Sequence, residues 1–318
     1  MTTAFITGVT GQDGSYLSEQ LVALGWDVHG MTRPGVTGEQ PVVSGVTTHF
    51  GDLSDLESVS SILDTIKPDA VINLAGLSSV AQSWKEPVVT AAVTGLAVGN
   101  MLETCRRISD ESSHQVRFIQ ASSSEIFGDS DDDPQTESSA IRPTSPYGAA
   151  KAYAHHLVSV YRARGMWAGS AILYNHESPR RPSTFVTRKI TMGVAAIARG
   201  EASTIELGNL DSRRDWGWAP DYMDAIVKMV SAERPNDYII ATGVTHSVRE
   251  FVTEAFLRVG IDDPDRYIEI NEKWNRPADG AIPRGDSSRI AEELGWRPTV
   301  GFSQVVSAMV EHDLSLLA

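Results

Sequence analysis

The sequence predicts an α/β protein: a doubly wound parallel sheet that carries a smaller mixed α/β unit toward its C-terminal end. Three observations support this fold class. Short apolar runs alternate with longer helical patterns through the first half of the chain, as in successive β-α-β units. A glycine-rich turn joins the first apolar run to the first helical pattern. Beyond about residue 175, proline and glycine break the chain into shorter elements.

The elements follow from short-range patterns. Strands are expected in four apolar runs, at residues 4–7, 27–31, 70–74 and 117–121. The first helix is expected over 15–24, because Leu17, Leu21 and Leu24 share one helix face and Gly25 is a natural stop. Further helices are expected after the capping residues 52–55 and at about 86–107, 147–164 and 222–230.

The change of pattern suggests two units. Residues 1–174, rejoined by 218–245, are expected to form a unit that binds a dinucleotide cofactor. Residues 175–217 and 246–318 are expected to form the smaller unit, which binds the substrate.

The composition excludes several function classes. A formal net charge of -14 argues against a general nucleic-acid or membrane-surface binder. No apolar stretch reaches the ~20 residues that a membrane span needs, and the first residues lack the pattern of a signal peptide. The single cysteine, Cys105, is expected to be a small buried side chain in a cytoplasmic protein. The acidic run 129–133 is interpreted as a solvated loop, and no metal site is expected.

Residues 8–14 form the glycine-rich turn between the first strand and the first helix. Such a turn lets the backbone approach a pyrophosphate, which then lies against the helix N-terminus, as in Rossmann-type sites. An ordinary tight turn is the alternative, but the position between strand and helix favours the cofactor. The expected contacts come from Gly8, Thr10, Gly11, Gln12, Asp13 and Gly14.

The end of the second strand bears on which cofactor binds. An NAD-selective site usually carries an acidic residue there, which bonds the ribose 2′-hydroxyl. This chain has Met31, Thr32 and Arg33 instead. Because a cation suits a 2′-phosphate, Arg33 favours NADP. Asp52 and Leu53 are expected at the adenine end of the same cofactor.

Tyr147 and Lys151 lie four residues apart at the start of a predicted helix, so both project from one face. We expect the Lys151 ammonium to lower the pKa of the Tyr147 phenol, which could then take a proton from a substrate hydroxyl while hydride leaves the same carbon. Residues 122–124 are serines after the 117–121 strand, at the sheet edge where ligands bind. The alternative is a serine-rich turn beside an ordinary surface helix.

Glu125 follows these serines. Carbonyl reduction needs only the hydroxyl, the tyrosine and the lysine, whereas a carboxylate can remove an acidified C–H proton or protonate a leaving hydroxyl. This chemistry suits the loss of water from a hexose whose C4 has become a ketone, because its C5 proton is then acidic. A helix-capping or solvent-facing carboxylate is the alternative.

Six blocks of sequence are spread over nearly the whole chain, at residues 8–17, 120–128, 145–151, 175–181, 185–190 and 208–217. Together they resemble the GDP-mannose 4,6-dehydratase family, which belongs to the extended short-chain dehydrogenases/reductases. The resemblance implies oxidation of GDP-mannose at C4, loss of water across C5–C6 and return of the hydride to C6. A 4-ketoreductase or epimerase on the same scaffold is the alternative, and a catalytically silent nucleotide-binding protein is a further one.

The resemblance also implies roles for single residues. Ser123, where the family has threonine, polarises the C4 oxygen, and Glu125 is the acid/base for C5 and C6. Tyr147 is the C4 base and Lys151 its partner. Trp216 is implied to line the substrate cleft, with packing in the core as the alternative. The residues implied to hold the nucleotide diphosphate are Asn175, Lys189, Arg214 and Arg276, and Asp279 is implied to contact the sugar or the ribose.

This sequence departs from the family pattern at several positions. Leu77 and Ser79 stand where the family usually has Gln and His. The segment that follows Arg33 is much shorter than in the family, where it helps to form a tetramer. We therefore expect a homodimer, paired through the helices at about 86–107 and 147–164.

Overall fold

The computed structural model describes residues 1–35, 40–112, 114–274 and 282–317. Its centre is a seven-stranded sheet of order β10-β6-β5-β4-β1-β2-β3, in which every neighbouring pair is parallel. The order reverses between β1 and β4, which is where open α/β sheets bind ligands. The strands are β1 (Thr3–Thr7), β2 (Asp27–Thr32), β3 (Val46–Phe50), β4 (Ala70–Asn73), β5 (Arg117–Ser123), β6 (Ala168–Leu173) and β10 (Tyr238–Ile240).

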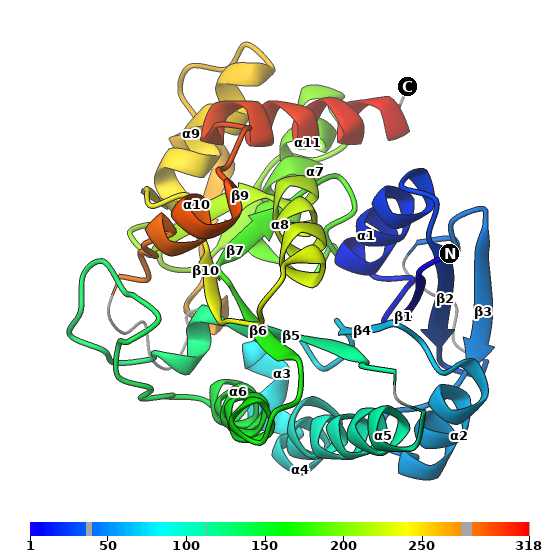
Figure 1. Cartoon of the computed structure of the whole chain (residues 1–318). Helices are drawn as coiled ribbons and strands as arrows, with labels where there is room; N and C mark the ends of the chain where they lie inside the picture. Colours follow the sequence, from blue (N-terminus) through cyan, green and yellow to red (C-terminus); the bar gives the residue numbers. More distant parts are fainter. Residues whose placement is uncertain (36–39, 113, 275–281, 318) are drawn as a thin grey trace.

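Helices cover both faces of this sheet (Figure 1). One face carries α1 (Gln12–Ala23) and α8 (Ala219–Ser231); the other carries α2 (Leu56–Ile66), α5 (Ala97–Ser112) and α6 (Pro146–Ala163). Each layer buries its own apolar cluster, because a parallel sheet is apolar on both sides. The doubly wound fold class is therefore confirmed.

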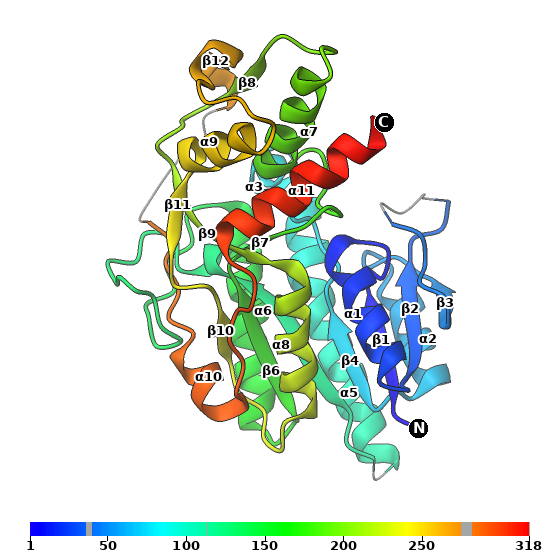
Figure 2. The ribbon, with the colours of Figure 1, turned by 90° about the horizontal axis from the view of Figure 1, so that it is seen from above.

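The rest of the chain forms smaller sheets and a third apolar cluster. A three-stranded sheet joins β11 (Thr245–Ser247), β9 (Arg213–Trp218) and β7 (Asn175–Glu177). A two-stranded sheet pairs β12 (Ile268–Ile270) with β8 (Ile205–Leu207). The helices α7 (Val186–Ala198), α9 (Val248–Arg258) and α11 (Phe302–Leu316) pack together beside them (Figure 2). The division of the chain into two units stays a prediction.

Two observed boundaries differ from expectation in ways that concern the site. Helix α1 begins at Gln12 rather than at residue 15, because the glycine-rich turn itself enters the first helical turn. Strand β5 continues to Ser123, so two of the serines are the last strand residues instead of a following turn. Strands β3 and β6 were not among the four expected strands.

A long helix precedes β5. It runs through α4 (Pro87–Thr90), the π-helical segment η1 (Ala91–Leu96) and α5 without a break. Pro87–Ser112 is long and apolar enough to cross a membrane, with a mean hydropathy of 1.4 in its most apolar window, half of which is buried. A helix that packs on a protein core meets the same criterion, and α5 contributes Val98 and Met101 to the apolar cluster under the sheet.

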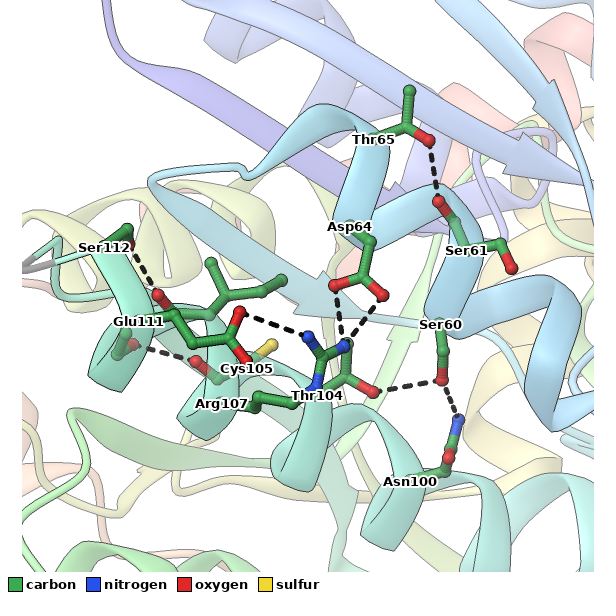
Figure 3. A network of polar contacts seen from close by, with 12 residues as sticks. Ser60, Ser61, Asp64, Thr65, Asn100, Thr104, Cys105, Arg107, Glu111 and Ser112 are labelled. Carbon is green, nitrogen blue, oxygen red and sulfur yellow. Dashed lines mark hydrogen bonds and ion pairs between the residues drawn. The ribbon is translucent and has the colours of Figure 1, made fainter.

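Helices α2 and α5 are joined by a polar network at the surface of that layer (Figure 3). Arg107 Nη2 donates to both carboxylate oxygens of Asp64 at 2.7 Å. Asn100 Nδ2 donates to Ser60 Oγ at 3.0 Å. The neighbouring Cys105 is buried, as expected, and burial raises the pKa of its thiol.

Candidate active site

The glycine-rich turn has the shape that a dinucleotide site needs. Gly8 has a φ of +71°, which favours glycine, and Gly11 N donates to Gly8 O at 3.0 Å to close the turn. A Cβ at Gly14 would lie 2.2 Å from Gly8 O, so only glycine lets α1 start this close to β1. Gly11 is the N-cap of α1 and provides no side-chain cap, so the first N–H groups of the helix remain available to an anion.

Arg33 and Asp52 meet at the ends of the neighbouring strands β2 and β3. The pKa of Asp52 is lowered mainly by hydrogen bonds from Ser54, and the nearby Arg33 charge lowers it further. Arg33 is exposed and Leu53 is buried beneath this edge. The structure thus groups the residues expected at the adenosine end of a cofactor.

The catalytic residues expected from the sequence meet between the end of β5 and the start of α6. Ser145 caps α6, because its hydroxyl accepts a hydrogen bond from Gly148 N at 3.0 Å. A Cβ at Gly148 would lie 2.6 Å from Glu125 O, so glycine allows α6 to press against η2 (Ser124–Ile126). This contact brings Tyr147 close to Ser123, whose hydroxyl acts to lower the pKa of the phenol.

Burial controls the proton affinities of this group. It raises the pKa of Tyr147 to about 12, although the Ser123 hydrogen bond opposes the rise. The net shift is therefore opposite to the lowering expected from Lys151, whose Nζ lies 5.7 Å from the centre of the Tyr147 ring and donates to Ala121 O at 2.7 Å. Burial also lowers the pKa of Lys151 to about 8, against the pull of the Asp13 charge.

A buried ion pair adjoins this group. His176 Nε2 lies 3.0 Å from both carboxylate oxygens of Asp13, and His176 Nδ1 lies 2.7 Å from Tyr174 O. Because a carbonyl and a carboxylate only accept, a charged imidazole that donates from both nitrogens satisfies this geometry. Gln12 Nε2 also donates to Asp13, at 3.0 Å. The pair fastens the glycine-rich turn to β7.

The two partners shift each other's pKa in opposite directions. Burial alone would raise the pKa of Asp13, but the charge and hydrogen bond of His176 outweigh it and lower the value to about 2. Burial alone would lower the pKa of His176, but Asp13 outweighs it and raises the value above 6.5.

The substrate residues implied by the family resemblance lie on three elements. Asn175 begins β7, Arg214 lies on the adjacent β9, and Lys189 lies in the first turn of α7. Arg276 and Asp279 lie outside the described residues. Of the two alternatives for Trp216, the structure shows core packing: the side chain is 2% exposed and packs against Phe251 and Phe302 in the third apolar cluster.

The model of the family described as GDP-mannose 4,6 dehydratase matches residues 5–309. The chain belongs to this family. An Arabidopsis thaliana GDP-mannose 4,6 dehydratase is 41% identical over 326 residues, which cover 98% of this chain and 90% of the relative. GDP-mannose 4,6-dehydratases of Vibrio cholerae and Homo sapiens are 39% and 38% identical, with coverage of 98% and 99% of this chain and 94% and 92% of the relatives.

Solved structures agree on the fold. The UDP-glucose 4-epimerase of Thermus thermophilus, in complex with NAD, matches with a TM-score of 0.85 at 25% identity, over 98% of this chain and 99% of that chain. The dTDP-glucose 4,6-dehydratase of Bacillus anthracis matches with a TM-score of 0.82 at 17% identity, over 98% and 96%. These matches show the same fold, and the family model and the relatives confirm the resemblance stated from sequence motifs.

Two residues of the GDP-mannose 4,6-dehydratase block at 175–181 were missed by sequence reasoning. His176 pairs with Asp13, and the Arg181 charge acts on Tyr147, Asp13 and His176 alike. The Arg181 guanidinium stacks on the Phe185 ring at 3.8 Å. A run of polar residues directly after a buried strand was the available signal.

Proposed function

We propose that this chain converts GDP-mannose to GDP-4-keto-6-deoxymannose, with NADP as its cofactor. Membership of the GDP-mannose 4,6-dehydratase family supports the overall reaction. The single observation that carries the proposal is the placement of Glu125 in the turn that directly follows Ser123, against the helix that bears Tyr147 and Lys151. A reductase has no use for that carboxylate, whereas an elimination requires one.

The residues fit a dinucleotide. The uncapped N-terminus of α1 behind Gly11 would hold the pyrophosphate through backbone N–H groups. Arg33 would hold a 2′-phosphate, with Asp52 beside it. A bound NADP would supply reversible hydride transfer between C4 and C6 of the sugar, and it would be unchanged overall. The NAD named with the Thermus thermophilus epimerase supports a nicotinamide cofactor in this fold, and Arg33 is the reason to favour NADP.

The chain's own residues move the C4 proton. Ser123 lies beside Tyr147 and favours the phenolate, so once Tyr147 has lost its own proton to solvent, a C4 hydroxyl beside the two residues could pass its proton to the Tyr147 oxygen. A phenol with a pKa of about 12 rarely loses its proton at neutral pH unless nearby cations help. Arg181 already lowers this pKa, and Lys151 is anchored one helical turn away.

Glu125 carries the elimination. Its carboxylate removes the C5 proton that the C4 ketone has made acidic, and the same group returns a proton to the C6 hydroxyl, which leaves as water. After the hydride reaches C6, Glu125 takes up a second proton from solvent and delivers it to C5, while Tyr147 releases to solvent the proton that it took from the C4 hydroxyl. Carbon, hydrogen and electrons balance with the loss of one water and no net oxidation.

The test is a panel of sugar nucleotides incubated with the purified chain and catalytic NADP⁺. We expect GDP-mannose to yield a product lighter by one water, with no net change in the NADPH absorbance. Stoichiometric NADPH consumption would instead identify a reductase, and an isomer of unchanged mass would identify an epimerase. Titration of NADP⁺ and NAD⁺ against the protein tests the Arg33 argument, which equal affinities would refute.

We also propose a homodimer and a cytoplasmic location. Apolar side chains are exposed on α4, η1 and α6, which pack against one another beneath the sheet (Figure 1). Association of this face with its copy would bury them. The exposed residues are Val88, Val89, Leu96, Tyr153 and Val160. Light scattering at micromolar concentration should give the mass of two chains, and a stable tetramer would contradict the proposal. The cytoplasmic location rests on the single buried cysteine.

A further inference from the structure

Trp274 belongs to a polar cluster that the proposed mechanism does not use. It is the last residue of η4 (Glu272–Trp274), and its side chain is 51% exposed. Lys189 Nζ stands 3.7 Å from the centre of its ring, which is a close cation–π contact. On its edge, the indole N–H donates to Glu206 Oε2 at 3.3 Å.

Backbone pairing holds in place the segment that carries Trp274. Glu206 is the middle residue of β8, which pairs in parallel with β12. Asn271 N donates to Leu207 O at 2.8 Å and so continues the pairing up to η4. Helix α7, which bears Lys189, packs on β8 (Figure 2). Lys189 and Trp274, 85 positions apart in the sequence, therefore meet on one small sheet.

The charges around Lys189 are arranged unevenly. Lys273 Nζ donates to Glu206 Oε2 at 2.6 Å, so the carboxylate of Glu206 already has a cationic partner. Burial lowers the pKa of Lys189, and Glu206 opposes this while Lys273 adds to it. Among the residues that the structure describes, no ion pair joins Lys189 to a carboxylate. The face of the Trp274 ring attracts the charge of the Lys189 ammonium but occupies none of its N–H donors, so these can still donate to a ligand.

We propose that Trp274 is a positioning residue for Lys189, and that its ring holds the ammonium ready to donate to the diphosphate of a nucleoside-diphosphate sugar. Glu206 supports this arrangement in two ways: it orients the indole through the N–H and it neutralises Lys273. The inference rests on the proposed function and on the role that the family resemblance implies for Lys189, which is to hold the nucleotide diphosphate of the substrate.

The test measures GDP binding by calorimetry in four proteins: the unaltered chain, Trp274→Leu, Lys189→Met and the double variant. Trp274→Leu should raise the Kd for GDP about threefold to tenfold, the range that a partly exposed cation–π contact supports. In the Lys189→Met background the same change should have no further effect. Trp274→Phe keeps a ring face and should restore most of the affinity.

Matched measurements separate positioning from folding. Trp84→Leu replaces another half-exposed tryptophan, on α3 (Val80–Lys85), and should leave GDP binding unchanged. With GDP-mannose, Trp274→Leu should raise KM and leave kcat close to that of the unaltered chain, because the diphosphate does not react.

Three outcomes would overturn the proposal. Additive effects of Trp274→Leu and Lys189→Met would mean that the ring acts on the ligand directly, for example by stacking on its base. An unchanged Kd in Trp274→Leu, or in Lys189→Met, would remove the contact from substrate binding. The activity of the unaltered chain separates the two claims. If it dehydrates GDP-mannose, any of these outcomes overturns only the role of Trp274; if it does not, the proposed function fails on its own.

Discussion

Two ion pairs of this protein have similar lengths and different surroundings. Arg107 and Asp64 join α2 to α5 at the surface, with N–O distances of 2.7 Å and side chains 41% and 42% exposed (Figure 3). His176 and Asp13 join β7 to the glycine-rich turn, with distances of 3.0 Å and side chains 9% and 24% exposed.

The difference teaches that burial, rather than distance, decides what an ion pair is worth. Water and salt screen an exposed pair, and the side chains lose entropy when they are held together. In a buried pair, the loss of one partner leaves a charge that neither water nor protein solvates. The protein can thus lose the Arg107 pair with little consequence, whereas the Asp13 pair is expected to hold the cofactor turn in place.

The largest effect is expected from His176→Gln. This variant leaves the Asp13 carboxylate, which is 24% exposed, without its cation, a loss that costs up to about 3–5 kcal/mol of stability where the pair is fully buried. Urea unfolding should report a loss of that order. NADP⁺ should also bind more weakly, because the turn that carries Asp13 is no longer fastened to β7.

The matched control is the double variant Asp13→Asn/His176→Gln, in which no charge is left over. It should recover a large part of the stability lost in His176→Gln. If His176→Gln costs less than about 1 kcal/mol, the pair is no more important than an exposed one and the comparison fails.

A smaller effect should appear in the pH dependence of stability. The pKa of Asp13 is lowered from 3.8 to about 2, so its contribution is complete above pH 3.8 and is lost as the pH falls toward 2. The pKa of His176 is raised above 6.5, so its contribution is complete below pH 6.5 and is lost as the pH rises through the raised value. For Asp13 the shift corresponds to about 2 kcal/mol.

The stability difference between the unaltered chain and the double variant should therefore be greatest between pH 3.8 and pH 6.5 and shrink on both sides. Urea midpoints measured across the range would show this. A difference that stays constant with pH would mean that the pair does not titrate as an ion pair.

The smallest effect is expected from Arg107→Gln at the surface. Arg107 lies near both Asp64 and Glu111. Water can solvate both carboxylates when Arg107 is replaced, so each of them loses only a screened contact. The urea midpoint should stay within experimental error of the unaltered chain, and activity should not change. A shift as large as that of His176→Gln would contradict the role given to burial.

Much of the catalytic edge could be predicted from the sequence, because local patterns encode it. The turn at residues 8–14 and the spacing of Tyr147 and Lys151 each lie within one segment, and the structure groups them at one sheet edge. The pairing of Asp13 with His176 could not be predicted, since 163 positions separate them and the contact depends on how β7 leaves the sheet. Burial likewise reversed the expected direction of the Tyr147 pKa, because depth is a tertiary property.

The same limit applies to the residues implied by the family alone. Trp216 belongs to a family motif. Only its packing against Phe251 of α9 and Phe302 of α11 reveals that its ring lies in the third apolar cluster. The strand alternation in residues 213–218 gave no way to choose between core and cleft, because both sides of β9 are covered.

The role of Glu125 is tested most directly by the reaction in deuterated water with GDP-mannose and NADP⁺. The unaltered chain should place solvent deuterium at C5 of the product and carry the substrate's C4 hydrogen to C6. Glu125→Gln should lower turnover about 100- to 10,000-fold, because an elimination loses its acid/base. Tyr147→Phe should act earlier and suppress the oxidation at C4. Near-normal turnover in Glu125→Gln, with deuterium still entering C5, would contradict the assignment of Glu125 and remove the main chemical support for a dehydratase.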